Sequence, residues 1–214
     1  MWNQCKYKII LASNSPRRKE LLAGLGIRFE VKILPDIEES YPEALPPSKV
    51  AEYISRKKAA EYMDEMRRGE LLITADTIVV LEGEIMGKPG DIDEARQMLR
   101  KLSGKTHQVY TGVTLTMVAS GNRHEGATGR PIASCRFRSF TARTDVKMAD
   151  LSTEEIDYYV TTFRPYDKAG AYGIQEWIGS IGVERIRGSY FNVMGLPVQR
   201  LYRELKKIIK TREL

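Results

Sequence analysis

Cysteine and histidine are scarce in this chain of 214 residues, which contains two of each. Cys5 and Cys135 make neither a disulfide framework nor a cluster of metal ligands, and such usage is typical of a reducing compartment. His107 and His124 belong to no His–Cys–Ser set with the character of a catalytic triad, so a covalent nucleophile is not expected. A Gly-rich Walker loop and a dinucleotide-binding fingerprint are missing as well.

Long apolar runs are also missing. None approaches the roughly 20 residues that a membrane span needs, and residues 1–6 lack the apolar stretch of a secretory signal. The net charge of +6 is modest for this length, and no basic block is interleaved with aromatic residues as in nucleic-acid-binding proteins. We therefore expect a cytoplasmic protein with a small anionic substrate, and neither a membrane nor a nucleic acid as partner.

What the chain does contain is an α/β pattern. Predicted strands cover residues 7–12, 28–33, 71–81, 84–86, 106–119, 132–147 and 181–186. Predicted helices cover residues 15–25, 48–68, 91–102 and 197–209, and a further helix begins after Ser152. Two Pro- or Gly-rich stretches, 34–47 and 163–173, are expected to be loops, and 119–131 the end of a hairpin. The pattern predicts one domain over residues 1–214, with a mixed β-sheet flanked by helices and two lobes around a central cleft.

A candidate anion site follows the first predicted strand, in the segment Ser13-Asn14-Ser15-Pro16-Arg17-Arg18. Ser15 suits the N-cap of a helix, and Pro16 suits its first position. Arg17 and Arg18 then lie where the helix dipole disfavours cations, which suggests a shared anion. With the hydroxyls of Ser13 and Ser15 they would form a cradle for a polyphosphate. The alternative is a capped helix with two solvated arginines.

Asp76 interrupts the nearly continuous apolar run from Leu71 to Leu81. Aspartate is depleted in strands, and a buried carboxylate is costly unless it is paired or bound to a metal. It is therefore a candidate metal ligand or a base for a water nucleophile. The alternative is a cap where the strand bends or ends.

Two lysines are candidates for binding the same anion. Lys58 shares a helical stripe with Val50, Ala51 and Ile54, so it either snorkels outward or points its ammonium into a site. Lys88 stands in the stiff turn Gly87-Lys88-Pro89-Gly90, a pattern that also occurs in ordinary surface turns.

Two loops add further candidates. Glu38 and Glu39 could supply oxygen ligands to Mg²⁺ or Mn²⁺, although a solvated acidic loop is the alternative. The loop 166–175 places small residues between aromatic ones, and Gln175 can donate and accept hydrogen bonds at once, as a nucleobase edge requires. The alternative is an ordinary loop packed by its tyrosines.

Taken together, these segments resemble those of the Maf proteins, a family of nucleoside triphosphate pyrophosphatases. The resemblance rests on Ser13–Arg18, Ala75-Asp76-Thr77, Gly87-Lys88-Pro89, Asp167–Gln175 and Asn192–Pro197, which span nearly the whole chain in the family's order. It implies an elongated α/β fold of the Maf/ITPase-like type, and a homodimer as a candidate assembly. The segment 119–136 departs from the family's pattern, because it is longer than the family's usual turn.

The resemblance also implies a reaction and a set of roles. The reaction is metal-dependent hydrolysis of a nucleoside triphosphate to the monophosphate and pyrophosphate, with Mg²⁺ or Mn²⁺. Asp76 matches the family's proton acceptor, and Glu38, Lys58 and Lys88 match polar positions of its active site. Arg17, Thr77 and Gln175 match the set that marks the dTTP and UTP subgroup. Two alternatives stay open: modified nucleotides such as 7-methyl-GTP or ITP as substrates, or a division-linked nucleotide-binding protein with little turnover.

Overall fold

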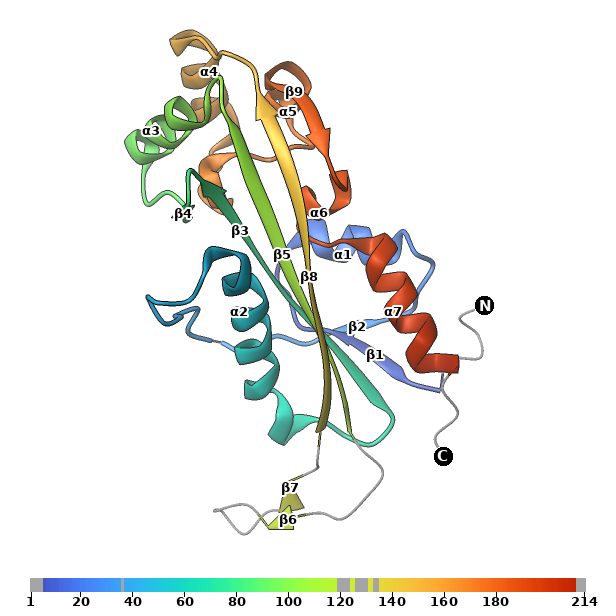
Figure 1. Cartoon of the computed structure of the whole chain (residues 1–214). Coiled ribbons are helices and arrows are strands. Elements are labelled where there is room, and N and C mark those ends of the chain that lie inside the picture. The colour runs from blue at the N-terminus through green and yellow to red at the C-terminus, as the bar shows by residue number, and fades with distance from the viewer. Residues whose placement is uncertain (1–5, 36, 119–123, 126–130, 133–134, 211–214) are drawn as a thin grey trace.

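A computed structural model of the chain describes residues 6–35, 37–118, 124–125, 131–132 and 135–210. Its centre is a mixed seven-stranded sheet in the order β2-β1-β3-β5-β8-β9, with β4 paired to β3 (Figure 1). Strand β1 is parallel to β2 and β3, and the other pairs are antiparallel. The strands are β1 (Lys8–Leu11), β2 (Glu30–Val31), β3 (Glu70–Leu81), β4 (Glu84–Met86), β5 (Thr106–Val118), β8 (Cys135–Met148) and β9 (Val183–Arg187). A separate pair joins β6 (His124–Glu125) and β7 (Pro131–Ile132). The predicted α/β class with a mixed sheet is confirmed.

Helices cover both faces of the sheet. They are α1 (Pro16–Ala23), α2 (Pro47–Glu61), α3 (Ile92–Leu102), α4 (Thr153–Phe163), α5 (Trp177–Gly182), α6 (Tyr190–Met194) and α7 (Val198–Lys210). None of the helices in the described part of the chain has the length and apolar character that crossing a bilayer requires. The predicted hairpin end, 119–131, lies mostly outside the described residues.

Three helices begin at side chains that cap them, and one of these is Ser15, as predicted. The side chains of Ser15, Asp91 and Ser152 each accept a hydrogen bond from the N–H three residues later. A reciprocal capping box at Asp91 is only half formed, because the side chain of Glu94 accepts the backbone N–H of Gly90 and not that of Asp91.

Helix α2 departs from its prediction at both ends. Ser48, with which the predicted helix starts, is not its cap, because the helix begins one residue earlier at Pro47, whose fixed φ suits the first helical position. The helix ends at Glu61 rather than near Arg68, and a 3-10 turn follows. The hydroxyl of Tyr62, just past the end, bonds the backbone of residues 32 and 34, a tertiary contact that local sequence does not reveal.

Two short helices, α5 and α6, were not expected. Residues 181 and 182, predicted as the start of a strand, belong to α5, and the strand itself is β9. Helix α5 folds tightly against the preceding loop, since a Cβ added at Gly179 would lie 1.8 Å from the carbonyl oxygen of Ile174. Such a short helix depends on this close packing rather than on a long apolar period.

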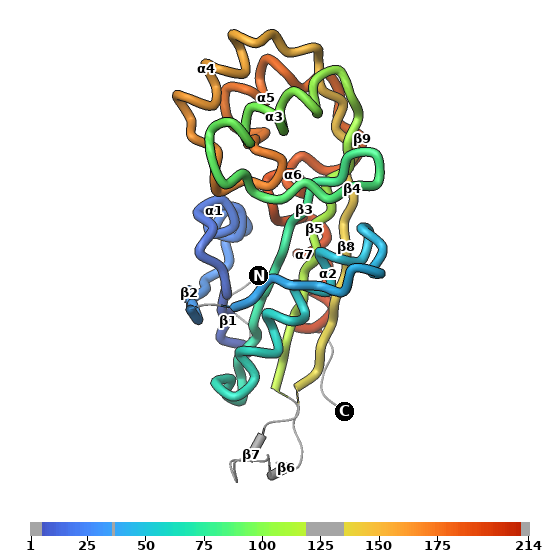
Figure 2. The backbone as a smooth tube through the Cα atoms, turned by 90° about the vertical axis from the view of Figure 1, so that its left-hand side faces the viewer, coloured from blue at the N-terminus to red at the C-terminus, as the bar shows by residue number. Residues whose placement is uncertain are grey.

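The long strands β3, β5 and β8 run through two lobes (Figure 2). At one end, the α3–α4 lobe packs helices α3, α4 and α5 around residues such as Leu99, Tyr159 and Ile178. At the other, the α1–α7 lobe packs α1 and α7 around residues such as Leu22 and Leu201. The elongated form with two lobes thus arises because three strands are shared by two separate apolar clusters.

Helix α2 lies on the opposite face of the sheet from α7 (Figure 1). Its approach is close, because a Cβ added at Gly112 of β5 would lie 2.3 Å from backbone atoms of Ala51 and Glu52. Gly112 is paired with Asp76 across the sheet. Because Gly112 has no side chain, α2 can pack closely against β5, next to the position where Asp76 of β3 pairs with Gly112.

One edge of β3 is open at its middle. On this side β3 pairs with β1 up to Ile73 and with β4 from Val79, and no described strand pairs with residues 74–78 between them. The gap lies just beyond the carboxyl end of β1, where ligands commonly bind in α/β sheets.

Candidate functional site

A cavity of about 360 Å³ occupies the gap at the edge of β3. Its wall comes from both lobes, from the start of α1, from α2 and from the loops before α2, α3 and α5. An adjoining hollow continues it along the segment 12–18. The predicted residues Ser15, Arg17, Arg18, Lys58, Asp76, Thr77, Lys88 and Gln175 all line the main cavity. Ser13 lines the adjoining hollow.

The start of α1 holds Arg18 against the open strand edge. Its guanidinium donates from Nε to the carbonyl of Gly195 (2.9 Å) and from Nη1 to the carbonyl of Ala75 (2.8 Å). A third bond runs from Nη2 to the hydroxyl of Thr77 (3.0 Å). Burial lowers the pKa of Arg18, and the charge of Asp76 opposes that effect. An arginine nevertheless keeps its charge, so a cation is fixed in the wall.

Arg17 lies beside it in the first turn of α1. Its Nη1 donates to Oδ2 of Asp167 at 2.8 Å, which joins α1 to the loop before α5. Arg17 and Arg18 thus share one cavity with the carboxylate of Asp76. The predicted convergence of distant basic residues on one acidic group in the β3 strand is present.

Lys58 lies at the centre of a group of charges. Its Nζ is 2.7 Å from Oδ1 of Asp76 and 2.7 Å from Oε1 of Glu39. Lys88 approaches the other oxygen of Glu39 at 3.7 Å. Asp76 is only 7% exposed, so Lys58 compensates a buried carboxylate and does not snorkel outward.

Glu39 and Glu38 point to different surroundings. Burial tends to raise the pKa of Glu39, but the hydrogen bond and charge of Lys58, with Lys88 and Arg18, hold it below its ordinary value. Glu38 instead binds Lys57 at 3.2 Å, its side chain is 75% exposed, and it does not line the cavity. The structure therefore brings Glu39, and not Glu38, into the group around Asp76.

The carboxylates suit a hard divalent cation. In the described part of the chain no three or more His, Cys, Asp and Glu side chains form a group that could hold a metal by themselves. Mg²⁺, however, is commonly held by one or two carboxylates together with substrate phosphates. Asp76 and Glu39 both lie within 2.7 Å of one ammonium nitrogen, so a cation position close to both oxygens fits this donor set.

Part of the cavity wall has a different character, because Val79, Met86, Val109 and Val193 give it an apolar surface. The exposed Gln175 lines the same cavity. Thr77 is 2.9 Å from the hydroxyl of Thr111 and 3.0 Å from Arg18, which fixes its position. An apolar slot with one amide suits a flat base with polar edges.

Sequence reasoning missed Lys168, which lines the cavity, and the neighbouring residues Glu176 and Tyr159. Lys168 is buried, and its Nζ lies 2.7 Å from Asp167 and 3.0 Å from Glu176. Tyr159 of α4 donates to the other oxygen of Glu176 and accepts the backbone N–H of Gly173. Lys168 stands within the loop singled out above, but nothing local marks Tyr159, because its partners come from another segment.

Comparison with known proteins gives consistent matches. The chain matches the family model described as "Maf-like protein" over residues 8–208. A dTTP/UTP pyrophosphatase of Phocaeicola vulgatus is 62% identical over 203 residues, covering 95% of this chain and 97% of the relative. A dTTP/UTP pyrophosphatase of Bacteroides thetaiotaomicron is 55% identical over 206 residues, covering 96% and 98%. Among solved structures, a nucleoside-triphosphatase / dITP/XTP pyrophosphatase from Mycobacterium abscessus is 14% identical with a TM-score of 0.43, covering 95% and 100%.

Proposed function

The chain belongs to the family of Maf-like proteins, and from this premise we propose that it hydrolyses dTTP and UTP to the monophosphate and pyrophosphate. The observation that carries the proposal is the single cavity in which Asp76 meets cations from three distant segments of the chain. The names of the relatives support the substrate class.

In this proposal the triphosphate lies along the basic wall. Arg17, Lys58 and Lys88 contact its oxygens, and the dipole at the start of α1 adds to the positive field. Arg18, already held by three bonds, contributes a fixed charge more than a mobile contact. Such positioning and neutralisation of charge account for most of the catalysis in phosphoryl chemistry.

Asp76 carries the proton transfer. A water attacks the α-phosphorus, the bond from that phosphorus to the bridging oxygen breaks, and pyrophosphate leaves with the bonding electrons. Asp76 accepts the proton that the water loses. Its Oδ1 is bound by Lys58, so the carboxylate is oriented before the substrate arrives.

A divalent cation, Mg²⁺ or Mn²⁺, is part of the proposal. Asp76 and Glu39 would hold it, and when bound it would neutralise charge on the phosphate oxygens. Lys58 occupies the place between the two carboxylates in the structure, and it would turn toward the phosphates when the cation binds. The role that the resemblance implies for Glu38 stays a prediction.

The base end would select the nucleotide. Gln175 can donate to one carbonyl of uracil or thymine and accept from its N3–H. Thr77 lines the same cavity and is held by Arg18 and Thr111. Together with Arg17 these are the residues that match the dTTP and UTP subgroup.

The test measures pyrophosphate release from dTTP, UTP, 7-methyl-GTP and ITP at equal concentration, with Mg²⁺ or Mn²⁺ and after chelation with EDTA. We expect the wild-type protein to turn over dTTP and UTP, and we expect EDTA to abolish this turnover. The substitution Asp76→Asn should lower the rate by about 10²-fold or more. Faster use of 7-methyl-GTP or ITP would reassign the substrate, and tight binding without pyrophosphate release would favour a regulatory role. Normal turnover by Asp76→Asn would remove Asp76 from the mechanism.

A further inference from the structure

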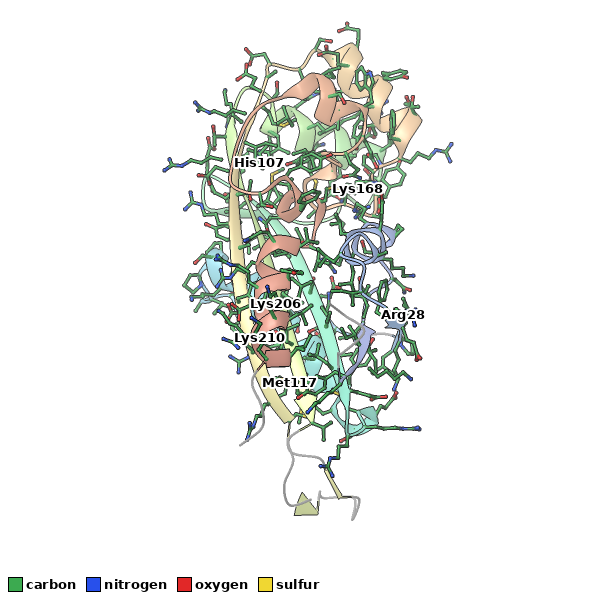
Figure 3. The ribbon with its side chains drawn as sticks, turned by 90° about the vertical axis from the view of Figure 1, so that its right-hand side faces the viewer. Arg28, His107, Met117, Lys168, Lys206 and Lys210 are labelled. Atoms are coloured by element: carbon green, nitrogen blue, oxygen red, sulfur yellow. The ribbon has the colours of Figure 1, made fainter. Side chains whose placement is uncertain are left out.

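We propose that Lys168 is a positioning residue that couples the triphosphate end of the cavity to its base end. The proposal rests on the proposed function, and it assigns a task to residues that this function did not use. Figure 3 shows Lys168 where the α3–α4 lobe meets α1. Only 8% of this residue is exposed, so its ammonium depends on the partners around it.

Two carboxylates bracket the ammonium of Lys168. Its Nζ lies 2.7 Å from Oδ1 of Asp167 and 3.0 Å from Oε1 of Glu176. The other oxygen of each carboxylate binds a different group. Oδ2 of Asp167 accepts from Arg17 at 2.8 Å, and Oε2 of Glu176 accepts from the hydroxyl of Tyr159. Asp167 is therefore shared between Lys168 and Arg17, and Glu176 is shared between Lys168 and Tyr159.

The base end is reached through Tyr159. Its oxygen accepts the backbone N–H of Gly173 at 3.0 Å. Gly173 touches its neighbours closely, because a Cβ added there would lie 2.8 Å from Nε2 of Gln175 and 2.8 Å from Cδ of Glu176. The place of the Gln175 amide thus depends on how Glu176 and Tyr159 hold this turn.

The phosphate end is reached through Asp167. Lys168 and Arg17 both donate to this one carboxylate, so they divide its negative charge. Without Lys168, Asp167 would depend on Arg17 for compensation and would compete with the triphosphate for that guanidinium. The loss of Lys168 should therefore weaken triphosphate binding and loosen base selection together.

Lys168→Met is the first test, because methionine keeps much of the volume and removes the charge. Three quantities are measured: kcat/KM for UTP, its ratio to kcat/KM for CTP, and the inhibition constant of inorganic tripolyphosphate, which probes the phosphate end alone. We expect kcat/KM for UTP to fall at least about tenfold, the preference for UTP to shrink, and tripolyphosphate to bind several-fold more weakly. Lys105→Met is the matched control, since it removes an exposed ion pair with Glu82 outside the cavity.

Tyr159→Phe is the second test, and it can test the proposed coupling even if Lys168→Met does not fold. It removes only the hydroxyl that joins Glu176 to Gly173, so the preference for UTP should fall while tripolyphosphate inhibition stays as in the wild type. An equal loss for all nucleotides with unchanged tripolyphosphate inhibition in Lys168→Met would overturn the proposal, because it would mark a merely structural lysine. An unchanged UTP preference in Tyr159→Phe would also overturn it. A wild-type protein without pyrophosphatase activity would instead refute the proposed function.

Discussion

At the scale of single residues, one lysine holds two carboxylates together in the centre of the site. Lys58 binds Asp76 and Glu39 at the same distance of 2.7 Å. A divalent cation that replaced the ammonium between these oxygens would find two ligands already close to one another. In the proposed site, the affinity for the metal should therefore depend on Glu39 as much as on Asp76.

Glu39→Gln tests this dependence. The amide keeps the shape but removes the negative charge, so the Mg²⁺ concentration that gives half-maximal rate should rise by about tenfold or more. The measurement is a Mg²⁺ titration of the initial rate with dTTP. Glu38→Gln is the neighbouring comparison, and because Glu38 binds Lys57 outside the cavity, it should shift the titration much less. The opposite order of effects would assign the ligand role to Glu38, the other candidate ligand in the acidic loop.

His107 gives a prediction about pH and stability. It is fully buried, its Nε2 lies 2.7 Å from the hydroxyl of Tyr172, and burial lowers its pKa to about 4. Below the ordinary pKa of 6.5, the unfolded chain binds a proton that the folded protein does not. The contribution of His107 to the free energy of unfolding is therefore fully present above pH 6.5 and is lost as the pH falls toward 4. Between pH 7 and pH 5 this loss should be about 2 kcal/mol.

His107→Gln removes this titration and keeps a polar group next to Tyr172. Urea unfolding of both proteins at pH 7 and pH 5 measures the effect. Carboxylates with lowered pKa values, such as Asp167, lose their stabilisation mainly below pH 5, and any small loss above that pH should be common to both proteins. The wild type should lose about 2 kcal/mol more than the variant. Equal losses would show that His107 is charged in the folded state or does not titrate in this range.

Local chemistry predicts some of these residues and not others. Asp76 stands out because a carboxylate in an apolar strand needs a partner, and Lys58 because a cation lies on an apolar helical stripe. Arg18 was expected in the same site, but its bonds to the carbonyls of Ala75 and Gly195 could not be. Backbone acceptors of this kind carry no side-chain signature, and only the fold brings them to the guanidinium.

At the scale of secondary-structure elements, the position of α2 decides the geometry of the site. The helix rests on β5 at Gly112, where a Cβ would lie 2.3 Å from the helix backbone. Lys58 is carried by this helix, and its partner Asp76 is paired with Gly112 in the sheet. The distance between the ammonium and the carboxylate is therefore set by a contact between backbones.

Gly112→Ala should separate these two elements. The added methyl group forces α2 away from the sheet, which should lower the free energy of unfolding by about 1–3 kcal/mol. It should also reduce kcat, because Lys58 moves with the helix. Urea unfolding and dTTP turnover are the measurements. Gly24→Ala serves as control, since Gly24 has φ −60° and its Cβ would meet only ordinary contacts at 3.5 Å and beyond. A Gly112→Ala protein as stable as Gly24→Ala would show that the helix does not depend on this contact.

Elements with strong local signals were predicted well. Strand β3 is almost entirely buried and mostly apolar, and α3 and α4 begin at side chains that cap them. The end of α2 and the short helices α5 and α6 were not predicted. Their limits follow from contacts with distant segments, such as Tyr62 against the start of the loop at residue 34, and a window of local sequence does not contain those contacts.

At the scale of the whole molecule, two apolar clusters share one set of strands. Strand β3 contributes Ile73 and Ala75 to the cluster of the α1–α7 lobe, and Val79 and Leu81 to that of the α3–α4 lobe. The cavity lies between these two groups of residues, beside residues 74–78. The site is therefore placed where one lobe gives way to the other, and both must be folded for it to exist.

This sharing predicts a single cooperative unfolding transition for residues 1–214, as one domain requires. Trp177 packs against the core of the α3–α4 lobe, so its fluorescence in a Trp2→Phe variant reports on that lobe alone, whereas far-UV circular dichroism reports on both. The two signals should give the same urea midpoint, because neither cluster can lose β3, β5 and β8 without exposing the other. Separate midpoints would mean that each lobe is stable by itself. In that case a triphosphate analogue bound between the lobes would raise the midpoint of the less stable lobe selectively. If there is one transition, the analogue should raise the single midpoint that both signals report.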